Sequence, residues 1–67
     1  MIVVNGQGSD VRAGETVLAV LARLGLGADA RGVAVAVDGE VVPRTTWASF
    51  ALPADAHIEV LTAMQGG

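Results

Sequence analysis

Residues 33–37 show the clearest pattern in the sequence, a strict alternation of valine and alanine that fits the period of two of a β-strand. Asp38-Gly39 follows, a pair that tolerates the positive φ angles of a tight turn. Residues 40–42 return from this turn and stop at Pro43, which has no backbone N–H to donate. We therefore predict a β-hairpin that turns at Asp38-Gly39.

Residues 17–24 show a different pattern, with Val and Leu recurring at spacings of three and four positions. Thr16 stands where an N-cap side chain belongs, and Gly25 stands where the left-handed residue that ends a helix belongs. This arrangement predicts one amphipathic helix over 17–24. The glycine-rich stretch 25–32 predicts a loop.

The two ends of the chain are also typical of strands. Residues 1–5 form an apolar, β-branched run that stops at Asn5-Gly6-Gln7-Gly8, and we expect a second short strand around 10–12 to complete a hairpin. Residues 58–62 predict the last strand.

A short helical turn is expected after Pro43. Thr45 or Thr46 can cap it, and the aromatic residues Trp47 and Phe50 would then point into the core. These are the only aromatic residues of the chain, so we interpret them as core residues.

The order of these elements predicts an α+β fold, a single two-layer domain over 1–67 in which one main helix packs on one face of a four- to five-stranded sheet. Since side chains alternate along a strand, parity separates the face that the helix covers from an open face. The covered face is predicted to hold Val33, Val35, Val37, Ile2, Val4, Ile58 and Val60. The open face is predicted to hold Ala34, Ala36 and Leu61.

The composition excludes several classes of chemistry. The chain has no cysteine, no lysine and one histidine, His57. It therefore lacks the ligands of a zinc site, a thiol nucleophile, and the lysine of phosphate-binding loops and Schiff bases. No metal site is expected.

The charge and the hydropathy exclude further partners. The net charge of −3 has the wrong sign for neutralising nucleic acid phosphates or for binding an anionic membrane surface. The longest apolar run, 17–22, is far too short to span a bilayer, and no basic leader precedes Ile2. We expect a cytoplasmic protein that contacts neither nucleic acid nor membrane.

The surrounding sequence gives little support to three candidate functional sites. The glycine pairs at 6–8 and 25–27 lack the third glycine of a nucleotide fingerprint. His57 has no Ser, Asp or Glu at a spacing that suggests a catalytic pair, and Arg44 could hold an anion or a partner carboxylate but is more often a solvated charge. The final Gly66-Gly67 is different, because residues without Cβ atoms can thread a narrow channel and present a terminal carboxylate to another protein's active site.

The stretch 38–44 followed by Trp47, the capped helix after Thr16, and the Gly66-Gly67 end together resemble the thiamine-biosynthesis sulfur carrier family, ThiS. The resemblance spans the whole chain and implies a β-grasp, ubiquitin-like fold. It also points to a mixed sheet in which the first and last strands are adjacent and parallel in the centre, and the apolar residues on both faces of 58–61 favour a central strand independently.

The resemblance implies a protein substrate and not an enzyme. The carboxylate of Gly67 would be adenylated by a separate ubiquitin-activating-like enzyme that uses ATP, so the carrier itself would hold no permanent cofactor. A sulfur donor such as a cysteine desulfurase or a sulfurtransferase would then convert it to a thiocarboxylate. Thiazole synthase would finally take the sulfur into the thiazole of thiamine.

Two regions are expected to serve these partners. Residues 63–67 are predicted to form a flexible tail, in which Gly66 gives Gly67 access to the partner's channel. Leu61 and Met64, flanked by Ala34 and Ala36, are predicted to form the partner-facing patch, because small alanines allow close approach and a leucine on the uncovered face adds little to the core.

Two other functions remain open. The small sulfur-carrying subunit of molybdopterin synthase shares the same fold and tail, although those chains look longer and tend to have prolines before the final glycines. A non-catalytic adaptor that binds through its open sheet face would not need the tail at all.

Overall fold

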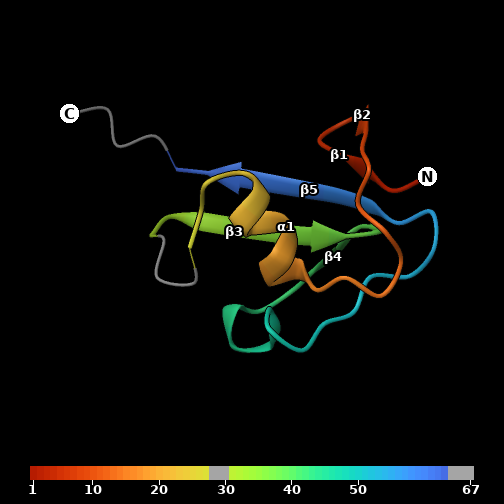
Figure 1. Cartoon of the computed structure of the whole chain (residues 1–67). Helices are drawn as coiled ribbons and strands as arrows, with labels where there is room; N and C mark the ends of the chain where they lie inside the picture. The colour runs from red at the N-terminus through yellow and green to blue at the C-terminus, as the bar shows by residue number, and fades with distance from the viewer. Residues whose placement is uncertain (28–30, 64–67) are drawn as a thin grey trace.

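A computed structural model describes residues 1–27 and 31–63 of the chain, and this part forms two layers (Figure 1). The elements, in chain order, are β1 (Val3–Val4), β2 (Gln7–Gly8), α1 (Val17–Arg23), β3 (Val33–Val37), β4 (Glu40–Val41), the 3-10 helix η1 (Arg44–Thr46) and β5 (His57–Thr62). The five strands form one sheet in the order β2-β1-β5-β3-β4, and α1 lies on one side of it. The predicted α+β class is confirmed.

The last strand, β5, lies in the centre of the sheet. It runs parallel to β1, with Val4 opposite Ile58, and antiparallel to β3, with Val35 opposite Val60. The predicted mixed sheet with adjacent, parallel first and last strands is therefore confirmed. Strand β3 pairs with β5 at five positions and β1 pairs with it at two.

Two tight turns of the same kind close the two hairpins. Asp38-Gly39 has φ angles of 50° and 86° and joins β3 to β4, as predicted. Asn5-Gly6 has nearly the same angles, 50° and 81°, and joins β1 to β2. Both pairs match the turn that suits the twist of a β-hairpin.

The expected second strand around 10–12 is wrong. Asn5-Gly6 reverses the chain at once, so pairing begins at Gln7–Gly8. The Ser9 hydroxyl then donates to the Ile2 carbonyl and accepts from the Val11 backbone N–H, which turns the chain away from the sheet. Val11 enters the core instead of an edge strand.

Helix α1 has the caps that the sequence predicted. The Thr16 hydroxyl accepts from the Ala19 backbone N–H at 3.1 Å. At the other end Gly25 has φ +80°, and the Leu26 N–H donates back to the Leu21 carbonyl at 2.8 Å. The helix ends one residue earlier than predicted, at Arg23.

The helical turn after β4 differs from the prediction in its cap. It begins at Arg44 with Pro43 in the N-cap position, and neither threonine caps it; the Thr46 hydroxyl donates to the Pro43 carbonyl instead. Trp47 is buried as predicted, and its indole N–H donates to the Val42 carbonyl at 2.9 Å. Phe50 packs half-buried against the core.

The core lies between the sheet and α1, and the predicted covered face is confirmed. Its buried members are Ile2, Val35, Val37, Ile58 and Val60, while Val4 and Val33 pack partly buried at its margin. Other elements contribute Val17, Val20 and Leu21 from α1, and Val11, Val42, Trp47, Leu52 and Ala56 from the connections. No helix among the described residues is long and apolar enough to cross a membrane.

Candidate functional site: the open sheet face and the exit of the last strand

The open face of the sheet carries the predicted patch residues. Ala34 lies directly opposite Leu61 in the pairing of β3 with β5, so both side chains project on the same side. Leu61 is 66% exposed, whereas Val60, the next residue along the strand, is 8% exposed. Ala36 is half-buried, and Ala34 is exposed. The structure thus brings together three of the four residues predicted for the partner-facing patch.

Sequence analysis missed one member of this surface. Val41 pairs with Ala36 across the β3–β4 hairpin and is 76% exposed. Parity applied through the Asp38-Gly39 turn would have found it, because residues opposite each other in a hairpin share a face. We define the open-face patch as Ala34, Ala36, Val41 and Leu61. Glu59 shares this face through its pairing with Ala36 and adds a negative charge beside the apolar residues.

The open-face patch is low except at Leu61 and Val41. Alanine side chains add little height to a sheet, so Leu61 and Val41 stand above Ala34 and Ala36. Large exposed apolar side chains are rare in the described part of this chain: only Met1 and Leu24 join Val41 and Leu61. Two of the four therefore lie on the open face of the sheet, on the non-adjacent strands β4 and β5.

The exit of β5 lies at one end of this face. After the last ladder pair, Val33 with Thr62, the Ala63 backbone N–H donates to the Gly32 carbonyl at 2.6 Å. On the other edge of β5 the Asn5 side chain continues the pairing: its carboxamide oxygen accepts from the Val60 N–H at 2.8 Å, and its amide group lies 3.3 Å from the Val60 carbonyl. The fold therefore holds the chain as far as Ala63.

The remaining predicted site residues, Met64, Gly66 and Gly67, lie outside the described residues, as does Gln65. Of the predicted tail 63–67 only Ala63 is described, and its backbone N–H is bonded to the Gly32 carbonyl. Their roles stay predictions. What the structure supplies is the point from which they start, Ala63, and the element that leads to it, β5.

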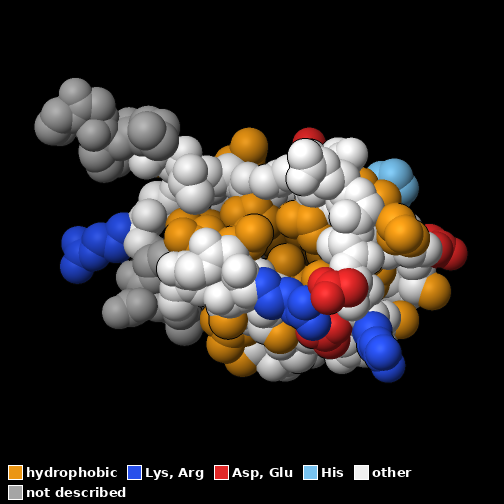
Figure 2. Space-filling model, turned by 45° about the horizontal axis from the view of Figure 1, so that its top comes forward, with side chains coloured by type: hydrophobic (Ala, Val, Ile, Leu, Met, Phe, Trp, Pro, Cys, Tyr) orange, Lys and Arg blue, Asp and Glu red, His pale blue; other side chains and the backbone are white. Residues whose placement is uncertain are grey.

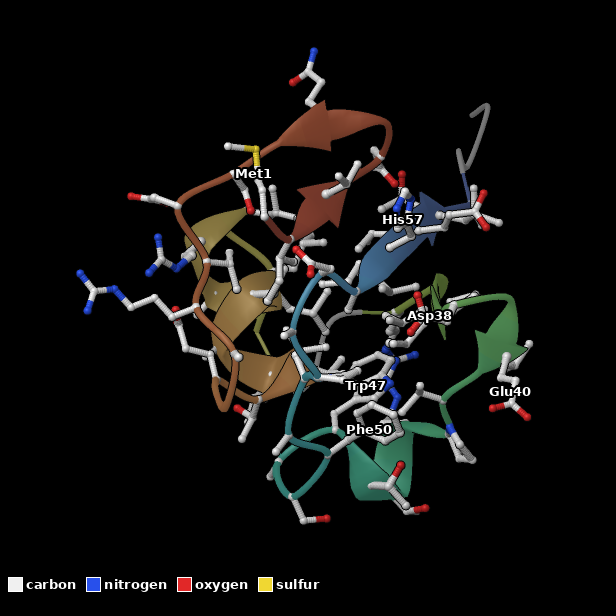
Figure 3. All side chains as sticks on the ribbon, turned by 90° about the vertical axis from the view of Figure 1, so that its right-hand side faces the viewer. Met1, Asp38, Glu40, Trp47, Phe50 and His57 are labelled. Carbon is white, nitrogen blue, oxygen red and sulfur yellow. The ribbon has the colours of Figure 1, made fainter. Side chains whose placement is uncertain are left out.

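His57 lies beside Asp38 at the start of β5, the end of this strand opposite its exit (Figure 3). The His57 backbone N–H donates to the Asp38 carboxylate at 2.9 Å, and the Asp38 N–H donates to the His57 carbonyl at 2.8 Å. These bonds extend the β3–β5 pairing into the turn. The Arg44 guanidinium lies 4.9 Å from the centre of the Trp47 ring, a cation–π contact.

Two carboxyl groups have lowered pKa values, both near the surface and away from the open-face patch. The Arg12 backbone N–H donates to the Glu15 carboxylate and, with the nearby Arg23 guanidinium, lowers the pKa of Glu15. The N-terminal ammonium contacts Asp55 and lowers the pKa of that carboxyl. Both groups favour the ionised form through these partners, and neither lies in a position for acid–base chemistry.

A groove of about 430 Å³ lies between the β1–β2 hairpin and α1 (Figure 2). Its floor is apolar, with Val4, Val11 and Val20, and an ion pair of Arg23 with Asp10, 2.8 Å apart, stands at its rim. Among the described residues no cluster of His, Asp and Glu could hold a metal ion. The groove thus offers an apolar surface but no reactive group.

Comparison with known proteins identifies the family. The model of the ThiS family matches residues 2–67. The chain belongs to the ThiS family. The crystal structure of the thiamine biosynthesis protein ThiS from Geobacter metallireducens superposes on this chain with a TM-score of 0.73, and the two sequences are 29% identical. The match covers 98% of this chain and 97% of the Geobacter chain. The solution structure of a thiamine biosynthesis protein from the same organism is 31% identical, with a TM-score of 0.74 over 98% and 86%. No curated protein matches the chain.

Membership of the ThiS family confirms the resemblance on which the β-grasp prediction rested. Covering nearly the full length of both chains, the match with the Geobacter crystal structure includes the helix, the central β5 and both hairpins as one unit. The open-face patch and the exit of β5 therefore lie on a chain with a ThiS-like fold.

Proposed function

We propose that this chain is a sulfur carrier of thiamine biosynthesis, in which the carboxylate of Gly67 is the group that carries sulfur. The observation that supports this most is that the ThiS family match continues to Gly67 and includes the Gly66-Gly67 pair. The described fold adds that the strand leading to this pair is central and well held up to Ala63.

The proposed chemistry has two steps, both catalysed by partner proteins. In the first, a carboxylate oxygen of Gly67 attacks the α-phosphorus of ATP on an adenylating enzyme, and pyrophosphate leaves. In the second, a sulfur nucleophile attacks the carbonyl carbon of the acyl adenylate, and AMP leaves. With hydrosulfide as the nucleophile the product is the thiocarboxylate and one proton is released. Adenylation is needed because a free carboxylate is a poor electrophile.

The chain's own residues contribute access and recognition, which is why we propose that it is not an enzyme. Gly66 and Gly67 have no Cβ atoms, so they can pass through a channel that fits bare backbone. The open-face patch, together with Met64, would dock the adenylating enzyme and then thiazole synthase, which receives the sulfur. A cysteine desulfurase or a sulfurtransferase would supply the sulfur, and these partners would meet the chain in the cytoplasm.

Intact mass spectrometry tests this function directly. The purified chain is incubated with the cognate adenylating enzyme, magnesium ATP and sodium sulfide, and we expect one terminal oxygen to be exchanged for sulfur. The chain without Gly67 should acquire none while its circular dichroism spectrum and Tm stay unchanged, because the core ends at Val60. Gly66→Val should keep the fold and slow the reaction for steric reasons.

The same experiment separates this function from a non-catalytic adaptor. An adaptor would keep its partners after loss of Gly66-Gly67 and would acquire no sulfur even as the wild type. If the chain lacking Gly67 still acquires sulfur at its terminus, the proposed role of Gly67 is wrong.

A further inference from the structure

The point at which the chain leaves the fold is set by one close contact. The pairing of β3 with β5 ends with Val33 opposite Thr62. The Ala63 N–H donates to the Gly32 carbonyl at 2.6 Å, and this hydrogen bond extends the pairing by one residue on each of the two strands. On the opposite edge, the pairing of β5 among the described residues ends earlier, at the Asn5 side chain and Val60. The contact between Gly32 and Ala63 is thus the last one that holds β5.

Gly32 makes this contact possible because it has no side chain. Its φ of +69° lies in the left-handed region, and a Cβ atom placed on it would be 3.1 Å from the Ala63 Cβ and 3.7 Å from the Ala63 nitrogen and oxygen. The first distance is shorter than an ordinary carbon–carbon contact. At position 32 even an alanine would require Ala63 to shift by a few tenths of an ångström, and the positive φ adds strain to alanine and to any larger side chain.

The other described glycines with positive φ do not share this property. A Cβ atom on Gly6, Gly14, Gly25 or Gly39 would meet nothing within 4 Å. Backbone conformation alone explains those four glycines. Among the described glycines with positive φ, only Gly32 requires glycine on both grounds, its backbone angle and the close approach of Ala63.

We propose that Gly32 is a positioning residue: through its contact with Ala63, here called the clamp, it fixes the point from which the residues leading to Gly67 extend, and so it sets the reach of the Gly67 carboxylate into the adenylating enzyme. This inference rests on the proposed function. Four residues follow Ala63, and a fully extended chain advances about 3.3–3.6 Å per residue, so the carboxylate can lie at most about 14 Å from the clamp. Loss of the clamp lengthens the segment between the last contact of β5 and the chain end from four residues to five.

The length of this segment matters because the rate of adenylation depends on where the Gly67 carboxylate is placed in the partner's active site. Holding a reacting group in position supplies much of the rate of a bound reaction, and a displacement of about 1 Å can lower the rate on the order of a hundredfold. The four residues of the open-face patch belong to β3, β4 and β5, so this part of the proposed docking surface keeps its place when Ala63 is released, and only the contribution of Met64 can change. Loss of the clamp should therefore lower kcat for the carrier much more than it changes KM.

The test measures the initial rate of thiocarboxylate formation against carrier concentration, with the adenylating enzyme, magnesium ATP and excess sodium sulfide. Gly32→Val should lower kcat about tenfold or more, with KM within about twofold. Gly14→Val is the matched control, since Gly14 has φ +93° and open space around it. It should lose Tm to a similar extent and retain the wild-type kcat.

Two further variants keep the test independent of folding defects. One glycine inserted between Ala63 and Met64 lengthens the segment from Ala63 to Gly67 but leaves the Gly32–Ala63 contact intact. This variant should therefore have a lower kcat and an unchanged Tm. Gly32→Ala combined with Ala63→Gly removes the Cβ–Cβ contact and should recover part of the kcat that Gly32→Ala alone loses. Hydrogen exchange at the Ala63 amide, protected in the wild type and fast in Gly32→Val, reports the clamp itself.

The inference is overturned if Gly32→Val and Gly14→Val lose kcat equally, or if the inserted glycine leaves kcat unchanged, while the wild type still forms the thiocarboxylate. That result would leave the proposed function intact. A wild-type chain that forms no thiocarboxylate overturns both.

Discussion

The two faces of β5 have opposite properties within a single strand. Ile58 and Val60 are 2% and 8% exposed and belong to the core under α1, whereas Leu61, one residue further on, is 66% exposed on the open-face patch. Alternation along the strand thus separates residues that stabilise the fold from residues that can be offered to a partner. In a chain of 67 residues this separation lets an exposed apolar face exist without weakening the core that the described residues form.

The largest stability effect is expected on the covered face. Ile58→Ala removes a side chain that is among the most deeply buried of the described residues, so the free energy of unfolding should fall by about 2–5 kcal/mol. Urea denaturation followed by circular dichroism measures this. A loss below about 1 kcal/mol would show that the two faces do not differ as the burial indicates.

The open-face patch should respond in the opposite way. Leu61→Glu should leave the free energy of unfolding nearly unchanged, because the side chain is largely exposed, but it should weaken binding to the adenylating enzyme by more than about 1 kcal/mol. Calorimetric titration gives the affinity and thermal unfolding gives the stability. A large fall in Tm with unchanged affinity would assign Leu61 to the core instead.

Val41 defines how far the patch extends. Val41→Ser should change the free energy of unfolding by no more than about 0.5 kcal/mol, as is usual for surface positions. Its effect on affinity should be smaller than that of Leu61→Glu, because valine is shorter and no charge is introduced. An affinity equal to the wild type would place the boundary of the patch between β3 and β4.

The smallest effect is expected from acid, and it should come from outside both faces. The pKa values of Glu15 and Asp55 are lowered in the folded chain, so their contribution to stability is present above the ordinary carboxyl pKa and is lost as the pH falls through the folded values. Stability should therefore decline below about pH 4.5, the ordinary pKa of a glutamate. Glu15→Gln should make this decline shallower in pH-dependent thermal unfolding, and an identical pH profile would contradict it.

Local pattern was enough to predict much of this fold. The alternation over 33–37 and the Asp38-Gly39 turn specify a hairpin by themselves, and Thr16 and Gly25 specify the ends of α1, because each signal depends only on residues close in the sequence. Parity alone predicted which side chains of β3 and β5 lie on the covered face and which lie on the open face. The same rule extended to β4 would have added Val41 to the patch.

The features that sequence reasoning missed depend on contacts between distant residues. Asn5 was interpreted only as the end of a strand, yet its side chain pairs with the backbone of Val60, 55 residues away. The contact of Gly32 with Ala63 depends in the same way on the register of β3 against β5. Neither leaves a local signal, since asparagine and glycine are common in any turn.

The burial of Trp47 provides an optical label for the fold. It is the only tryptophan, the chain has no tyrosine, and its ring is 2% exposed with the indole N–H bonded to the Val42 carbonyl. Its emission should therefore shift to longer wavelength when the core opens to water. Because the ring belongs to the core and not to the open-face patch, docking of a partner without tryptophan should leave that emission in place. One fluorescence measurement can thus separate unfolding from binding in the same sample.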